Sequence, residues 1–152
     1  MVGPWALSIG DTNPTATDWA SGATQCVQDC KALLAANSYQ SAYMSGGLAV
    51  ELALKARIMH TERWNAWPSR KRRPDVHSHN LGNLMSAAGL RVVIEAEVRA
   101  GTNAGLAWMV VKDFDINARY PLGRPFPVRL AQDFVEAVDG LELVQWLTTG
   151  IT

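Results

Sequence analysis

The sequence predicts a single, mostly α-helical domain in which the helices form a bundle. Its length of 152 residues corresponds to one domain, and 48% of them are hydrophobic, enough for a core without metal or disulfides. Apolar residues recur with a helical period along most of the chain, and Pro, Gly and Asn separate the periodic segments. We assign residues 1–14 to an N-terminal arm and residues 15–152 to the helical domain.

The first two helices are expected over residues 17–36 and 38–62. Thr15 or Thr17 can serve as the N-cap of the first helix, and Asn37 can end it. Its apolar stripe consists of Trp19, Ala23, Cys26, Cys30, Leu33 and Leu34. The second helix is apolar or small on nearly every side, which is typical of a central helix. Because Gly46 and Gly47 each cost about 1 kcal/mol in a helix, we expect another helix to approach closely there.

The middle of the chain is less regular. Pro68 and Pro74 exclude a regular helix over residues 63–78, after which Ser78 can cap a short helix over 79–88. Apolar and charged residues alternate at the start of segment 91–111, which could form a strand. No other run offers that strand a partner, so we expect two short helices broken near Gly101-Thr102-Asn103.

A last helix is expected over residues 128–149. Its predicted buried stripe consists of Leu130, Phe134, Ala137, Val138, Leu141 and Val144. An acidic stripe of Asp133, Glu136, Asp139 and Glu142 lies on the opposite face.

Charge and cysteine content favour an ordinary cytoplasmic protein. Lys and Arg total 14, as do Asp and Glu, so bulk charge indicates neither a nucleic-acid nor a membrane partner. Cys26 and Cys30 are spaced i,i+4, which is unfavourable for a disulfide within one helix. Residues 1–10 lack the basic residue of a signal peptide, and the longest uncharged stretch, residues 32–50, is too polar to span a membrane.

Four sequence motifs occur in a characteristic order. They are AVELALKA at Ala49–Ala56, HNLGNLM at His79–Met85, NARYP at Asn117–Pro121 and the pair Trp146-Leu147. Together they resemble the HEPN family (higher eukaryotes and prokaryotes nucleotide-binding), whose patterns include A-x-E-x-x-L-K-A, H-x-L-x-x-L and R-Y-P. The resemblance covers residues 19–147. It implies an all-α, up-and-down bundle of about five helices, often a homodimer, that frequently acts with a nucleotidyltransferase partner.

Some HEPN proteins are ribonucleases that carry R-x(4–6)-H near the position of Arg119. No histidine follows His79 here, so this pattern is absent from its usual place. Arg72 with His77, and Arg73 with His79, match the spacing within the loop before the third helix. They are the only candidate catalytic residues, for a metal-independent ribonuclease or toxin.

The candidate ligand-binding residues each allow a structural alternative. The Arg119 guanidinium can bind a phosphate while Tyr120 flanks a base, or Arg119 can pair with a carboxylate. His79 either fixes a helix start or contacts a ligand. Glu51 and Lys55 form either a surface i,i+4 pair or part of a groove. Arg57 lies in an apolar stripe, and its head either extends outward or points into an inter-helix cleft.

The run Arg70, Lys71, Arg72 and Arg73, here called the basic loop, is the strongest charge feature. It is either a solvated loop or a contact for RNA, nucleotide phosphates or an acidic partner. Trp64 and Trp67 precede it and can stack on bases or cover the end of the bundle.

A zinc site built from Cys26, Cys30, His77 and His79 matches no standard spacing, so we expect buried thiols and no metal. The only expected cofactor is a possible nucleotide ligand.

Three functions follow from these features. The first is a non-catalytic module that binds a nucleotide or anion, or an accessory partner of a nucleotidyltransferase. The second is a HEPN ribonuclease or toxin. The third is a dimerisation or interaction module, in which the basic loop meets the acidic stripe of the last helix in trans.

Overall fold

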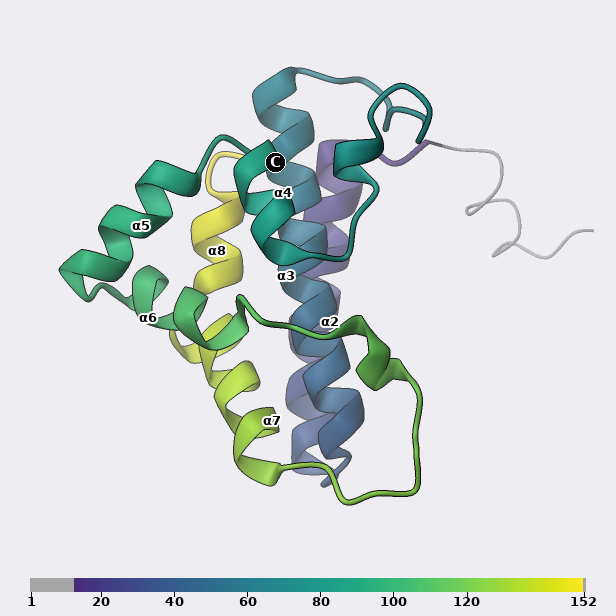
Figure 1. Ribbon diagram of the computed structural model, residues 1–152, viewed down its shortest axis with the longest axis vertical. Coiled ribbons are helices and arrows are strands. Elements are labelled where there is room, and N and C mark those ends of the chain that lie inside the picture. Colours follow the sequence, from purple (N-terminus) through teal and green to yellow (C-terminus); the bar gives the residue numbers. More distant parts are fainter. Residues whose placement is uncertain (1–12, 152) are drawn as a thin grey trace, which may run out of the picture.

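The computed structural model describes residues 13–151, which contain helices and no strand (Figure 1). The α-helices are α2 (Ala16–Ala35), α3 (Tyr39–Glu62), α4 (Leu81–Ala87), α5 (Arg91–Ala100), α6 (Asn103–Val111), α7 (Val128–Val135) and α8 (Leu143–Thr148). Two 3₁₀ turns, η1 (Pro74–Val76) and η2 (Ile116–Arg119), and a π turn, η3 (Glu136–Gly140), complete the set. The all-α prediction is confirmed for these residues. Most of the predicted N-terminal arm, residues 1–12, lies outside them.

Helix α3 is the central helix, as its composition predicted. It packs against α2, α4, α7 and α8, and most of its apolar residues are buried. A Cβ atom added at Gly46 would lie 3.5 Å from Phe134 Cβ in α7. One added at Gly47 would lie 2.2 Å from the Phe114 ring, in the segment after α6. The close approach is therefore found at Gly47, where it comes from an aromatic side chain and not from the predicted helix, while the contact of Gly46 with α7 leaves room for a Cβ atom.

Helices α2 and α3 form a hairpin with well-defined ends. Thr15, rather than Thr17, caps α2: its Oγ1 accepts from the Asp18 backbone N–H, and the Asp18 carboxylate accepts from the Thr15 N–H. Asn37 has φ of 61° just beyond the end of α2, consistent with its predicted role there.

The two-helix prediction for residues 91–111 is also confirmed. Gly101 has φ of 67° and ends α5, and Thr102 Oγ1 accepts from the Gly105 N–H to begin α6. A Cβ at Gly105 would lie 2.3 Å from the Glu97 carbonyl oxygen, so this glycine permits the close contact of α5 with α6. Figure 1 shows that the α5–α6 hairpin projects from the side of α3 opposite α2.

Two predicted helix boundaries are wrong. Ser78 does not cap a helix that starts at His79. Instead the Asn80 side chain accepts from the Asn83 N–H and α4 begins at Leu81, while Ser78 accepts from the Asn80 N–H. Asn is at least as good an N-cap as Ser, and the later residue is the one that acts.

The predicted continuous helix over 128–149 is divided into α7, η3 and α8. Glu142 has φ of 58° and interrupts the helical conformation before α8. The π turn admits one extra residue, so the buried face changes phase along the chain. Leu130 was predicted to be buried but is 37% exposed, whereas its neighbour Ala131 is buried.

None of the helices within residues 13–151 combines the length and the apolar character needed to cross a membrane.

Candidate functional site

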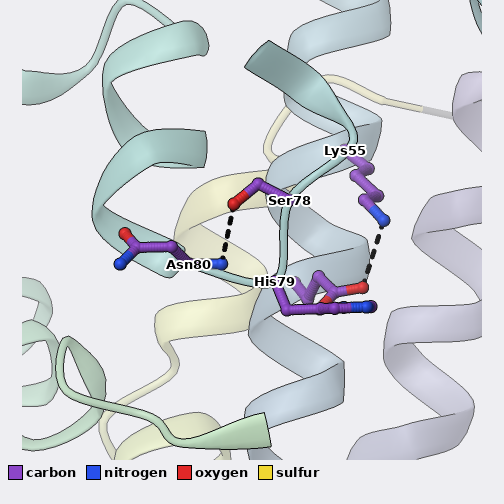
Figure 2. Close-up of polar contacts among 5 residues, drawn as sticks. Lys55, Ser78, His79 and Asn80 are labelled. Atoms are coloured by element: carbon purple, nitrogen blue, oxygen red, sulfur yellow. Dashed lines mark hydrogen bonds and ion pairs between the residues drawn. The ribbon is translucent and has the colours of Figure 1, made fainter. Parts of the chain in front are cut away.

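A buried carboxylate lies at the centre of α3. Glu51 is 3% exposed, and its two oxygens contact two different basic side chains. Lys55 Nζ lies 3.1 Å from Oε2, and His79 Nδ1 lies 2.8 Å from Oε1. Figure 2 shows Lys55 and His79 converging on this point from α3 and from the segment before α4. When Glu51 is ionised, His79 Nδ1–H is the donor of this contact, because an ionised carboxylate only accepts hydrogen bonds.

Two tryptophans shield the Lys55 ammonium. Lys55 Nζ lies 5.4 Å from the centroid of the Trp19 ring and 5.8 Å from that of Trp67, within range of cation–π attraction. The indoles contact each other edge to face, with centroids 5.5 Å apart. The Lys55 side chain is therefore only 12% exposed, whereas His79 is 53% exposed. Glu51 and Lys55 form a largely desolvated ion pair instead of a surface pair.

The cysteines and histidines do not form a metal site. Cys26 and Cys30 are free and buried in the core. Burial, with a contribution from nearby carboxylates, raises the pKa of each thiol to about 11, so both stay protonated and poorly nucleophilic. His77 Nε2 lies 2.6 Å from the Pro68 carbonyl oxygen, away from the thiols. Across residues 13–151, no group of three or more His, Cys, Asp or Glu side chains is arranged to hold a metal ion.

The basic loop is folded against the bundle. Arg73 makes a bidentate ion pair with Asp75, at 2.9 and 2.7 Å, and its guanidinium lies 4.9 Å from the centroid of the Trp64 ring. This pairing lowers the pKa of the Asp75 carboxyl. The other basic side chains of the loop, Arg70, Lys71 and Arg72, are exposed and make no ion pair with the described residues.

A cleft with a volume of about 510 Å³ lies next to the basic loop. The cleft is lined by two tryptophans, two arginines and three smaller residues. They are Trp64, Trp67, Arg72, Arg73, Ala66, Pro68 and Ser69. We call it the tryptophan–arginine cleft.

Arg119 and Tyr120 lie at the other end of α3. Gln40, in the first turn of α3, donates its side-chain N–H groups to the carbonyl oxygens of Ala118 and Tyr120 and so holds η2 in place. The Arg119 guanidinium lies 4.8 Å from the centroid of the Tyr120 ring and has no carboxylate partner among the described residues. A cleft of about 400 Å³, here called the Arg119 cleft, is lined by Leu33, Gln40, Ser41, Met44, Ser45, Ala118, Arg119 and Pro121.

Arg57 has the contacts of a helix cap. Its Nε donates to the Leu147 carbonyl oxygen at 2.8 Å, and its Nη2 donates to the Thr149 carbonyl oxygen. These bonds satisfy carbonyl groups at the end of α8. Partial burial lowers the pKa of the guanidinium. Arg57 thus contacts α8 and lines neither of the two clefts described above.

Apart from Arg57, which contacts α8, the predicted site residues separate into three places. Glu51, Lys55 and His79 meet at the middle of α3. The basic loop and Arg119 lie near opposite ends of this 24-residue helix, which is about 36 Å long (Figure 1). The structure does not bring these two groups of basic residues together.

Sequence reasoning missed the part played by Trp19 at this site. Trp19 contacts Lys55 and Trp67, although it was assigned only to the apolar stripe of α2. The one available signal was an aromatic residue at the start of that stripe. Compared with protein-family models, with curated proteins and with solved structures, the chain shows no match.

Proposed function

We propose that the protein is a HEPN-like, non-catalytic module that binds a nucleotide or a related anion in the Arg119 cleft. The observation that carries this proposal is an exposed guanidinium, free of carboxylate partners among the described residues, on the wall of a 400 Å³ cleft. A cleft of this size is within the range of small-molecule sites.

The lining of the cleft suits a ligand with a phosphate and an apolar ring. Arg119 offers two parallel N–H donors to a phosphate, and the Ser41 and Ser45 hydroxyls add short polar contacts. Leu33 and Met44 supply an apolar wall for a base. The Tyr120 ring lies against the guanidinium and restricts its orientation, which reduces the entropy lost on binding.

The resemblance to the HEPN family supports the same function. Two of its motifs contact each other through Glu51 and His79, although 28 residues separate them in the sequence. The up-and-down arrangement, the homodimer and the nucleotidyltransferase partner belong to this proposal as well. The ribonuclease alternative gains no support from the contacts of its Arg–His pairs. Arg73 pairs with Asp75, His77 contacts the Pro68 carbonyl oxygen and His79 contacts Glu51, so no contact joins an arginine to its histidine among the described residues.

Calorimetry with ATP, GTP and their monophosphates tests the proposal. We expect binding by at least one nucleotide, and at least tenfold weaker binding by Arg119→Ala, because a hydrogen bond to a charged group contributes about 1.5–3 kcal/mol. The matched control is Arg99→Ala, which removes an exposed arginine from α5. Absence of binding at millimolar nucleotide, or equal loss in both variants, would contradict the proposal.

A further inference from the structure

Positive charge is concentrated in one segment of an otherwise balanced chain. Residues 63–78 contain five basic residues and one acidic residue, whereas the whole chain has 14 of each. The single acidic residue, Asp75, is paired with Arg73. The other four basic residues, Arg63, Arg70, Lys71 and Arg72, are exposed and make no ion pair with the described residues, and the nearby Glu62 offsets only part of their charge. Such a patch attracts polyanions to one end of the bundle.

The segment is held in one conformation from both sides. Trp67 packs against Trp19 and Trp64, and the Lys55 ammonium lies over its ring. At the other end of the segment, Val76 is fully buried and His79 is bonded to Glu51. Because these contacts fix the backbone before a ligand arrives, binding would not incur the entropy cost of ordering a free loop.

The Ser69 turn positions the arginines of the tryptophan–arginine cleft. The backbone N–H groups of Arg72 and Arg73 both donate to the Ser69 carbonyl oxygen, at 3.1 and 3.0 Å. Arg73 contacts the Trp64 ring and pairs with Asp75. Arg72 is therefore the cleft-lining cation that makes no ion pair with the described residues. Arg70 and Lys71 are exposed beside it and continue the positive surface outside the cleft.

We infer that the tryptophan–arginine cleft binds single-stranded nucleic acid, at a site separate from the Arg119 cleft. Indole and guanidinium planes stack with unpaired bases of any sequence, and adjacent cations track the phosphates. The cleft supplies the stacking surface in Trp64 with Arg73 and one cation in Arg72. The exposed Arg70 and Lys71 extend the cationic surface beside it.

Other anionic partners would contact only part of this surface. A mononucleotide would engage the cleft but leave Arg70 and Lys71 without phosphates. An acidic peptide would pair with the cations but has no planar bases for the aromatic wall. A duplex keeps its bases stacked and presents mainly backbone and groove surfaces, so it would gain little from the cleft.

Titration of the full-length protein with an oligouridylate of about twelve nucleotides tests the inference, with tryptophan emission and oligonucleotide anisotropy as readouts. The loop variant combines Arg70→Ala, Lys71→Ala and Arg72→Ala. We expect it to bind at least tenfold more weakly. The slope of log K against log salt should fall by about 2, since each phosphate contact on a single strand contributes about 0.7.

The matched control combines Arg91→Ala, Arg99→Ala and Arg129→Ala. It changes the net charge by the same amount at exposed positions on α5 and α7, and we expect less than a twofold effect. A second variant, Trp64→Leu, tests stacking and should weaken binding at least fivefold while its circular dichroism stays native. Because Arg70, Lys71 and Arg72 are exposed, the loop variant remains informative even if Trp64→Leu fails to fold.

Three results would overturn the inference. They are equal binding losses in the loop and control variants, binding of polyglutamate as tight as that of the oligonucleotide, and the absence of any binding at low salt. If Arg119→Ala abolishes oligonucleotide binding and the loop variant does not, the oligonucleotide occupies the Arg119 cleft. The inference would then fail while the proposed function stands.

Discussion

Gly46 and Gly47 are adjacent in α3 but have opposite steric surroundings. At Gly46 the nearest atom to an added Cβ would be at 3.5 Å, an ordinary van der Waals contact. At Gly47 the added Cβ would lie 2.2 Å from an atom of the Phe114 ring, which is itself packed against Tyr43 and Phe134. The same substitution should therefore have opposite effects at the two positions.

We predict that Gly46→Ala raises the free energy of unfolding by up to about 1 kcal/mol, because alanine loses less backbone entropy in a helix. Gly47→Ala should lower it by about 1–3 kcal/mol, because Phe114 must leave its rotamer or shift α3. Urea unfolding of the two variants measures both changes. Each glycine serves as the other's control, and changes of the same sign would refute this account of the packing.

The site at Glu51 was partly predictable at the level of single residues. The i,i+4 spacing is enough to predict the contact of Glu51 with Lys55. It does not predict the contact with His79, which depends on the path of the whole segment between α3 and α4. Nor does spacing predict the indoles of Trp19 and Trp67, which come from two separate elements to cover Lys55.

At the scale of elements, the sequence predicted the helix boundaries that depend on residues close to the boundary itself. The break between α5 and α6 follows from Gly101 in a left-handed conformation and from the Thr102 cap, both of which act within a few residues. The division of the last helix has a different cause. The π turn lets Leu143 and Leu147, which lie off the predicted stripe, reach the core. Such a change of phase depends on neighbouring helices, so periodicity along one segment could not reveal it.

Glu142 shows the backbone cost of that division. Its φ of 58° is in the left-handed region, which costs a residue with a side chain about 1–2 kcal/mol. We predict that Glu142→Gly raises the free energy of unfolding by up to about 1 kcal/mol, since glycine adopts this conformation without that cost.

Glu136→Gly is the matched control for Glu142→Gly, because Glu136 has helical φ and ψ of −60° and −42°. We expect this variant to lose about 1 kcal/mol. Chemical denaturation of both variants provides the comparison. Destabilisation by both substitutions would show that the left-handed residue carries no strain.

At the scale of the whole molecule, α3 separates two candidate ligand sites. The Arg119 cleft lies beside its first turns, and residues 63–78, which include the basic loop, follow its last turn. Between them, the buried Glu51 carboxylate binds Lys55 of the same helix and the half-exposed His79, and this second contact holds the chain that follows residues 63–78 against α3. An ion pair this well buried contributes more to the fixed position of that segment than to net stability, because desolvation offsets much of its attraction.

Helix α5 is the least buried α-helix among residues 13–151. In α5 only Ile94 is buried, whereas Val92 is 75% and Val93 is 45% exposed. The main packing partner of α5 is α6, and α3 is covered by helices along its length. Helices with little buried apolar surface open locally at a lower free energy than the global transition requires.

We therefore predict that the amides of α5 exchange hydrogen at least about tenfold faster than those of α3, with little dependence on low denaturant concentrations. Gly105→Ala sharpens the test, because its Cβ would press on the Glu97 carbonyl group and separate α5 from α6. This variant should accelerate exchange in α5 further and leave α3 nearly unchanged. Hydrogen exchange followed by mass spectrometry resolves the two helices. If both helices exchange with the same opening free energy in the wild type and in the variant, the hairpin opens only when the whole domain unfolds. The described helices would then form one cooperative unit.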